Sequence, residues 1–176
     1  NLQEFRRSTF PENPDSDDDG LLDGVETNDG TFNDLASDTG TNPLDDDSDD
    51  DGLKDGVETN DGTFDDVASD TGSNPLEIDS DLDLIPDGFE AANGLNPNTD
   101  DAAGDLDVDQ SSNLEEFTNG TLPNDNDTDD DGVLDGAESN TGIFVDGSNT
   151  GSDPLNPDSD GDGLIDGVES GTGTFV

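Results

Sequence analysis

Acidic side chains recur along this chain at one fixed spacing, Asp-x-Asp-x-Asp-Gly-x-x-Asp-x-x-Glu, which first occurs over residues 15–26 as DSDDDGLLDGVE. Carboxylates at positions 1, 3, 5, 9 and 12, a glycine at position 6 and a backbone carbonyl at position 7 are the features of a loop that wraps a calcium ion. The glycine permits the sharp turn behind the third ligand. Ligation by oxygen alone, without His or Cys, selects a hard cation, and six or seven ligands on a flexible loop favour Ca²⁺ over Mg²⁺. The pattern therefore predicts calcium binding.

The spacing occurs in full in loop 1 (15–26), loop 2 (47–58), loop 5 (127–138) and loop 6 (158–169), and with departures in loop 3 (79–90) and loop 4 (105–116). We expect about one Ca²⁺ in each of the six loops, and more ions are possible. The residue at position 7 contributes its backbone carbonyl. The predicted metal ligands are Asp15, Asp17, Asp19, Leu21, Asp23, Glu26, Asp47, Asp49, Asp51, Leu53, Asp55, Glu58, Asp79, Asp81, Asp83, Ile85, Asp87, Glu90, Asp105, Asp107, Asp109, Ser111, Asn113, Glu116, Asp127, Asp129, Asp131, Val133, Asp135, Glu138, Asp158, Asp160, Asp162, Leu164, Asp166 and Glu169.

Loops 3 and 4 keep the liganding positions but depart at position 6, where Leu84 and Gln110 replace the glycine. A β-carbon at a position with positive φ costs about 1–2 kcal/mol. We therefore expect the site in loop 3 to be weaker or differently shaped. In loop 4, Gln110 is a poor substitute for the glycine, but the liganding positions are intact.

The loops must be positioned by a repeat, because residues 15–46 and 47–78 are nearly identical and related units follow. The predicted organisation is the tail of a preceding repeat (1–14), calcium repeats (15–46, 47–78), a variant (79–104), a short variant (105–126), a further repeat (127–157) and a truncated one (158–176). Residues 1–64 also align with residues 113–176, so Asn1 and Glu4 match the last two side-chain ligands of loop 4. We expect this chain to be part of a longer array.

Apolar residues stand mainly at positions 7 and 11 of the loops, a spacing that places each pair on one face of a short helical turn. The glycine at position 10 and the TNDG or SNTG that follows predict single-turn helices. Phenylalanines 32, 64, 144 and 175 are expected to cap small cores, and the DTGTNPL-type segments to form tight connectors. The acids Asp38, Asp70 and Asp153 in these segments either contribute to second ions or form a solvated surface. The predicted fold has little regular secondary structure and is an elongated, solenoid-like or rod-like array of calcium-stabilised tandem loop repeats.

The composition excludes several classes of function. The chain carries 50 Asp and Glu against 3 Lys and Arg, a formal net charge of -47, and only 24% hydrophobic residues, so we expect it to be unfolded without a counter-cation. The negative charge excludes a nucleic-acid surface. The sequence has no Cys, and therefore no disulfide, and it has no His, Tyr or Trp, which removes common catalytic bases and sugar-stacking platforms.

The motifs DSDDDGLLDGVE, DSDDDGLKDGVE, DTDDDGVLDGAE and DSDGDGLIDGVE, with their TNPL or DPLNP lead-ins, resemble thrombospondin type 3 repeats in the cysteine-free form of bacterial cell-surface and secreted proteins. The resemblance covers essentially the whole chain. It implies calcium-wrapped, loop-dominated arrays that act as stiff extracellular spacers, stalks or adhesion segments. The chain departs from the animal repeats by lacking paired cysteines and by ending its motif in Glu, so calcium is the only staple.

The leading functional hypothesis is a structural array, rigidified by Ca²⁺, in an extracellular or cell-surface fibre, stalk or adhesin. Its partners would be neighbouring copies or the longer parent chain, with self-assembly into a filament and glycan contacts as further possibilities and no membrane insertion. Extracellular modules bind calcium at roughly 10⁻⁴–10⁻³ M, which suits the calcium level outside cells. The alternative is a calcium-dependent adhesion module that presents an acidic surface to a partner, glycan or mineral. Paired carboxylates can hydrolyse glycosides, but the well-placed acids here belong to loops, so we predict no enzymatic activity.

Overall fold

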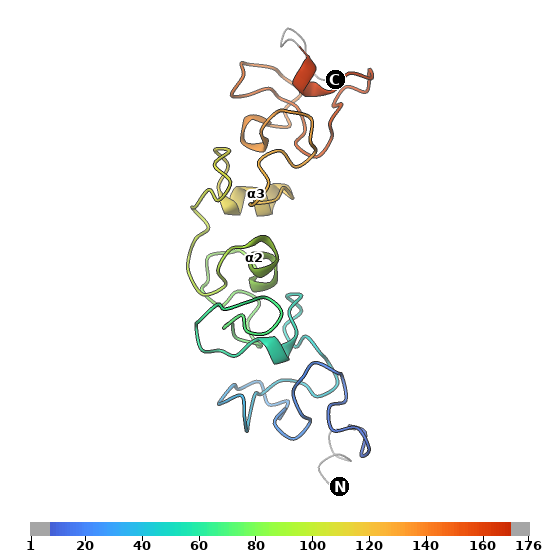
Figure 1. Cartoon of the computed structure of the whole chain (residues 1–176), viewed down its shortest axis with the longest axis vertical. Coiled ribbons are helices and arrows are strands. Elements are labelled where there is room, and N and C mark those ends of the chain that lie inside the picture. The colour runs from blue at the N-terminus through green and yellow to red at the C-terminus, as the bar shows by residue number, and fades with distance from the viewer. Residues whose placement is uncertain (1–7, 170–176) are drawn as a thin grey trace. The chain divides into compact units, whose positions relative to one another are not determined.

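The computed structural model of the protein describes residues 8–169, and this part of the chain has little regular secondary structure, as predicted (Figure 1). The chain divides into two compact units, unit 1 ending at Asp100 and unit 2 beginning at Asp101. The helical segments are the 3₁₀ helices η1 (Asp55–Val57), η2 (Asp135–Ala137) and η3 (Asp166–Val168) and the α-helices α2 (Asp87–Asn93) and α3 (Asn113–Asn119). Within the described residues, β-structure is limited to the isolated bridges Asp34–Asp38, Asp66–Asp70 and Asp146–Asn149. No helix in residues 8–169 has the length and apolar character needed to cross a membrane.

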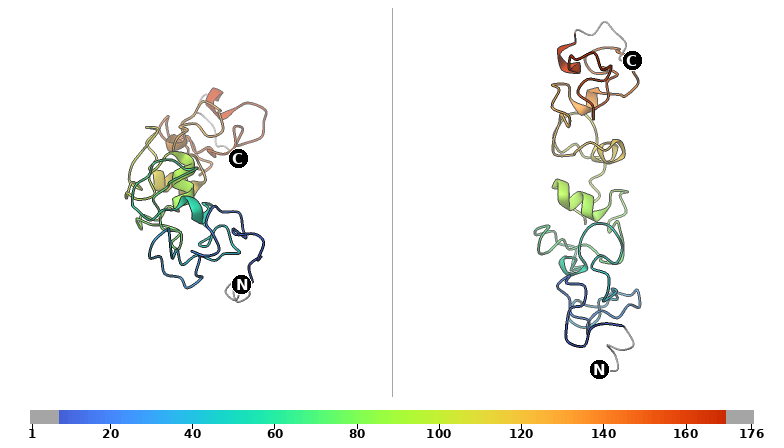
Figure 2. Two further views of the ribbon diagram at one scale, coloured as in Figure 1. Left: turned by 60° about the horizontal axis from the view of Figure 1, so that its bottom comes forward. Right: turned by 90° about the vertical axis from the view of Figure 1, so that its right-hand side faces the viewer.

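Each helix begins at position 9 of a loop, so the loops determine where helices start. Short helical ribbons are separated by long stretches of loop along the chain (Figure 2). The residue before each helix is extended, as at Lys54 with φ -91° and ψ 140° before η1. The acidic residues at positions 9 and 12 fall in the first turn of α2, where a negative charge interacts favourably with the helix dipole. In loop 1 the same stretch forms only a turn, which the Val25 N–H closes by donating to the Leu22 carbonyl at 2.8 Å.

The prediction of single-turn helices holds for η1, η2 and η3 but is wrong for α2 and α3, which have seven residues each. Gly88 stands at position 10 inside α2, so a glycine there does not end the helix. The residues after position 12 decide the length. In loops 3 and 4 they continue the helix to Gly94 and Gly120, whose left-handed φ values of 81° and 83° form C-caps. In loop 2 the helix ends at Glu58, which is extended, because the TNDG sequence that follows is a poor helix former.

After loops 1, 2 and 5 the chain makes an excursion, which we define as residues 27–41, 59–73 and 139–152. The second excursion closes on itself because the Asn60 N–H donates to the Ser73 carbonyl at 2.8 Å and the Gly62 N–H to the Gly72 carbonyl at 3.0 Å. Gly72 has a φ of 69°, and a β-carbon there would lie 2.5 Å from the Thr63 nitrogen, so only glycine fits. The DTGTNPL-type connector at the end of each excursion therefore packs against the residues that begin the same excursion. Loops 3 and 4 are followed by a longer helix in place of an excursion.

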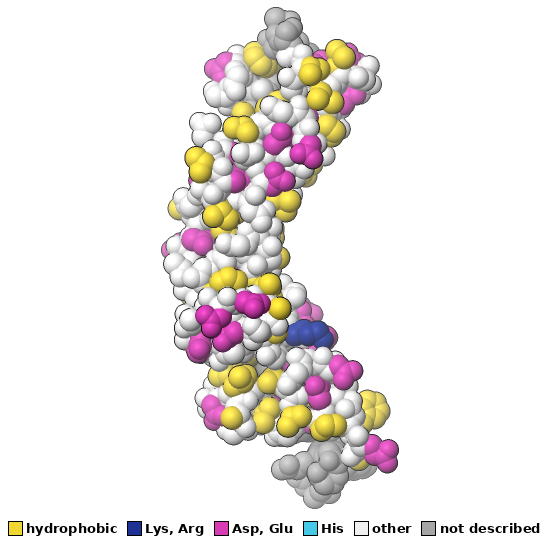
Figure 3. Space-filling view, viewed as in Figure 1, with side chains coloured by type: hydrophobic (Ala, Val, Ile, Leu, Met, Phe, Trp, Pro, Cys, Tyr) yellow, Lys and Arg dark blue, Asp and Glu magenta, His cyan; other side chains and the backbone are white. Residues whose placement is uncertain are grey.

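The interior is unusual because charged side chains make up much of it. Apart from prolines, the buried apolar side chains among the described residues are Leu21, Leu53, Ile85, Ala91, Leu95, Ala102 and Ala137. Position 7 supplies three of these, while phenylalanines 32, 64 and 144 are half-buried and Phe175 lies outside the described residues. Four position-12 glutamates, by contrast, have no exposed surface: Glu26, Glu58, Glu90 and Glu116. On the face shown in Figure 3, apolar and acidic side chains are interspersed at the surface.

Candidate metal centres

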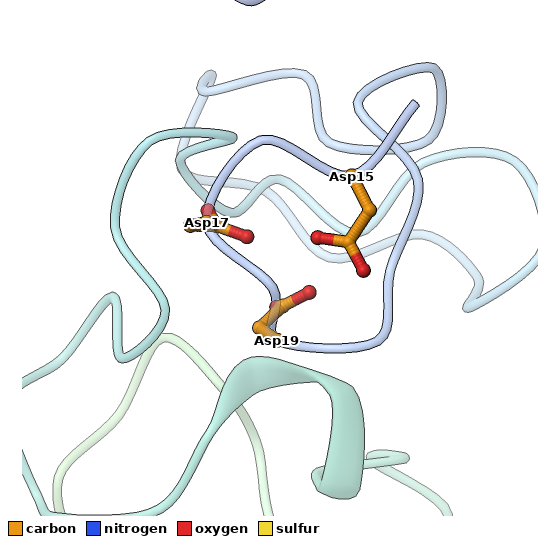
Figure 4. Close-up of side chains that lie close together, drawn as sticks. All are labelled: Asp15, Asp17 and Asp19. Carbon is orange, nitrogen blue, oxygen red and sulfur yellow. The ribbon is translucent and has the colours of Figure 1, made fainter. Parts of the chain in front are cut away.

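Each loop is closed by hydrogen bonds from its own backbone to the carboxylates at positions 1 and 5. In loop 2, Asp47 Oδ2 accepts from the Gly52 N–H at 2.9 Å, and Asp51 Oδ1 accepts from the Leu53 N–H at 2.7 Å. The other five loops have the same two bonds. These bonds turn the carboxylates at positions 1, 3 and 5 into the concave side of the loop. Figure 4 shows this arrangement for Asp15, Asp17 and Asp19.

Loops 3 and 4 close in the same way, although they lack the glycine at position 6. The Leu84 N–H donates to Asp79 Oδ2 at 3.0 Å, and the Gln110 N–H donates to Asp105 Oδ2 at 3.1 Å. Their φ values of 85° and 87° are the strained left-handed values that the sequence predicted. The hydrogen-bonded frame of these loops therefore has the common form, because the backbone accepts the strain and keeps its turn; a weaker site in loop 3 stays a prediction.

Three carboxylates in each of several loops come close enough to share a cation. The ligand oxygens of Asp15, Asp17 and Asp19 lie within 4.8 Å of one another, and so do those of the groups 47, 49, 51 and 79, 81, 83. The position-12 glutamate adjoins the same region, because its ligand oxygen lies within 4.8 Å of that of Asp19, and Asp17 and Asp19 are the charges that raise the pKa of Glu26 most. Positions 1, 3 and 5 thus lie together in loop 1, and position 12 lies against position 5.

Three of the buried glutamates keep carboxylate oxygens that have no hydrogen-bond donor. Glu26 Oε2, Glu58 Oε2 and both carboxylate oxygens of Glu116 are inaccessible and have no hydrogen-bond donor. Burial, with repulsion from neighbouring aspartates, raises the pKa of Glu26 to about 8, that of Glu58 to about 9 and that of Glu116 to about 8. A buried, unpaired carboxylate is costly unless a proton or a cation neutralises it.

The protein itself offers no cation for this purpose within the described residues. Lys54 is the only basic residue of the stretch 8–169. It lies at the surface, where it forms an ion pair with Asp46 at 2.7 Å. An oxygen-lined, negatively charged cluster of this kind fits a bound hard cation such as Ca²⁺.

The residue at position 9 is held by position 2, a role that the motif analysis missed. In loop 2, Asp55 accepts from the Ser48 N–H at 2.8 Å and from the Ser48 hydroxyl at 2.7 Å. The same pair of bonds recurs in loops 1, 3, 5 and 6. Ser or Thr at position 2 of these five loops was the available signal. Loop 4 has Leu106 there, whose N–H alone donates to Asn113 at 3.2 Å.

Hydroxyl groups of the excursions also donate hydrogen bonds to position-12 glutamates, a contact that the sequence did not suggest. The Ser73 hydroxyl donates to Glu58 Oε1 at 3.0 Å and is 2.7 Å from the Thr71 hydroxyl. In loop 1 the Thr41 hydroxyl donates to Glu26 Oε1 at 3.5 Å. The signal was the repeated TGT or TGS of the connectors, whose two hydroxyls stand two residues apart.

The remaining predicted residues fall into three groups. In loop 6, Asp162 and Leu164 are exposed and Glu169 is half-buried, so this loop is the most open of the six. Asn1 and Glu4, predicted as part of a further loop, lie outside the described residues. Asp38 and Asp70 in the excursions accept hydrogen bonds from Thr27 and Thr59, each at 2.7 Å.

These centres are therefore defined by the chain's own geometry. No family model, no curated protein and no solved structure matches this chain.

Proposed function

We propose that this chain is a calcium-binding structural repeat array within an extracellular or cell-surface fibre, stalk or adhesin. In this proposal each loop wraps a Ca²⁺ through positions 1, 3, 5, 7 and 12, and the ions stabilise a solenoid-like row of repeats of the thrombospondin type 3 kind. The role is structural and involves no catalysis. The observation that carries the proposal is that Glu26, Glu58 and Glu116 are fully buried at position 12 and keep carboxylate oxygens without a hydrogen-bond donor, close to other acidic side chains.

Electrostatics supports the same proposal. With a formal charge of -47 and one basic residue among residues 8–169, the chain has no internal source of neutralisation. Because the ligands come together only in the folded loop, calcium binding and folding form a single equilibrium. Calcium-free protein should therefore be expanded.

The test compares the circular dichroism and hydrodynamic radius of the full chain in millimolar CaCl₂, in equimolar MgCl₂ and in chelator. We expect a compact state in Ca²⁺, little compaction in Mg²⁺ and expansion in chelator. A radius that stays the same in all three conditions would refute the proposal. Electron microscopy and sedimentation of the calcium-loaded chain then test self-assembly, since a structural fibre predicts contacts with neighbouring copies.

A calcium-dependent adhesion module is the second candidate. It is favoured by exposed acids outside the loops, such as Asp29, Asp34, Asp61 and Asp65, which remain available to a partner, glycan or mineral. Calcium-dependent retention on a calcium-mineral resin would favour this reading if the loaded chain stays monomeric.

A further inference from the structure

Carboxylates from consecutive loops meet at a second kind of cluster, separate from the triads within each loop. Asp19 and Glu26, at positions 5 and 12 of loop 1, lie with Asp55, at position 9 of loop 2, and the ligand oxygens of all three are within 4.8 Å of one another. Asp19 is 7% exposed, and Glu26 and Asp55 have no exposed surface. The group Asp51, Glu58 and Asp87 repeats the arrangement between loops 2 and 3.

The backbone holds these carboxylates together despite their charge. Gly56, next to Asp55, packs directly on the Asp19 carbonyl, and a β-carbon at Gly56 would overlap that oxygen. Between loops 2 and 3 the Gly88 N–H donates to Asp51 Oδ2 at 3.0 Å. The glycine at position 10 thus brings position 9 of one loop against position 5 of the loop before it.

Unused oxygens in these clusters point to a ligand. Asp19 Oδ1 accepts from Leu21 and Asp55 accepts from Ser48, but Asp19 Oδ2 and Glu26 Oε2 are buried without any donor. In the second cluster, Glu58 Oε2 is likewise buried without a hydrogen-bond donor. Three carboxylates at contact distance, with buried and unpartnered oxygens, repel one another unless a cation lies between them.

We propose that each of these junctions is a further divalent-cation site, shared by consecutive loops and additional to the ion that each loop wraps. Positions 5 and 12 of one loop and position 9 of the next supply its carboxylates. Positions 5 and 12 serve both sites, so filling the loop site orients two ligands of the junction site. The inference rests on the proposed calcium binding and adds that calcium ties one repeat to the next.

Unit 2 has the same residues at the corresponding positions. Between loops 4 and 5, the Gly136 N–H donates to Asp109 Oδ2, and Asp109 and Asp135 both act on Glu116. Between loops 5 and 6, Asp131 and Asp166 repel each other. Loop 6 is the natural contrast, since no later loop lies among the described residues and its Asp162 is exposed.

The experiment counts Ca²⁺ bound to the full chain by native mass spectrometry and by equilibrium dialysis with metal analysis, and it compares the Asp55→Asn and Asp50→Asn variants. Asn is tolerated at position 9, where Asn113 occurs naturally. Asp50 is an exposed residue at position 4, so its variant removes the same charge without touching either cluster. We expect the unaltered chain to bind more ions than it has loops. Asp55→Asn should weaken one ion by roughly tenfold or more, because affinity depends on the number of charged ligands, while Asp50→Asn leaves ion number and affinities unchanged.

The outcomes separate this inference from the proposed function. If the chain compacts in Ca²⁺ but binds no more ions than loops, or if Asp55→Asn binds like Asp50→Asn, the junction sites are refuted and the loop sites stand. If the chain neither binds Ca²⁺ nor compacts, both ideas fail. Asp87→Asn repeats the test at the second junction, and circular dichroism at saturating Ca²⁺ confirms that each variant is folded.

Discussion

The packing of one loop on the next predicts a large effect from a single methyl group at Gly136. This glycine stands at position 10 of loop 5, and a β-carbon there would lie 2.5 Å from the Asp109 carbonyl oxygen and 2.8 Å from the Ser111 nitrogen. Both neighbours are backbone atoms, so neither can rotate away. Gly136→Ala must therefore push loops 4 and 5 apart.

The expected loss of stability follows from two costs and one gain. Overpacking a tight contact costs about 1–3 kcal/mol. Loss of the hydrogen bond from the Gly136 N–H to the Asp109 carboxylate costs about 1.5–3 kcal/mol. The reduced entropy of the unfolded chain returns about 0.4–1 kcal/mol. We expect Gly136→Ala to destabilise unit 2 by about 1.5–5.5 kcal/mol.

Amide hydrogen exchange in millimolar Ca²⁺, followed by mass spectrometry, measures this loss separately in each unit. Exchange suits this chain because it has neither Trp nor Tyr to report unfolding by fluorescence. Peptides from unit 2 should lose protection, and those from unit 1 should not. Gly24→Ala is the matched control, since Gly24 also stands at position 10 but has no atom of the described residues within 4 Å of a built β-carbon. Equal protection in the two variants would refute the interlocking of loops.

Two further predictions concern strain and charge. Leu84→Gly should stabilise unit 1 by roughly 1 kcal/mol in urea unfolding at saturating Ca²⁺, because it removes a β-carbon at φ 85° from a side chain that is 69% exposed. Leu22→Gly, at an exposed position without positive φ, should not stabilise, and equal effects of the two variants would contradict the strain. In calcium-free protein, the raised pKa values of Glu26 and Glu58, about 8 and about 9, mean that the folded state binds more protons than the unfolded one. Their contribution to stability is present below the ordinary pKa of 4.5 and is lost as pH rises through 8 to 9, so the hydrodynamic radius should shrink on acidification, and expansion over this range would contradict the assignment.

The local geometry of each loop could be predicted because it depends on residues close together in the chain. The spacing of Asp15, Asp17 and Asp19 is sufficient to place three carboxylates on one concave side, and position 12 followed as expected. The longer helices of loops 3 and 4 could also have been predicted, by comparing the helix propensity of the residues before Gly94 and Gly120 with that of the TNDG sequence in loops 1 and 2.

The junctions between loops could not be predicted in the same way, because they join residues far apart in sequence. Position 9 looked like one more ligand of its own loop, yet Asp55 lies against Asp19 of the loop before. The glycine at position 10 looked like a helix breaker, whereas Gly56 is required by the close approach of the Asp19 carbonyl. A motif records that a residue type recurs, but only the packed repeat tells which neighbour requires it.

The interior is filled more by carboxylates than by apolar side chains, which indicates that packing of the repeats depends on cation binding. Few apolar side chains are buried, and at about 25 cal/mol per Å² their burial provides little against the entropy of ordering the chain. The space that apolar residues fill in other proteins is here occupied by position-12 glutamates and their aspartates. If a cation neutralises each cluster, the clusters become the strongest contacts in the fold, and removing it leaves buried repulsion in their place. A variant that cannot bind ions at one junction should therefore loosen the two adjoining repeats before it affects any other repeat.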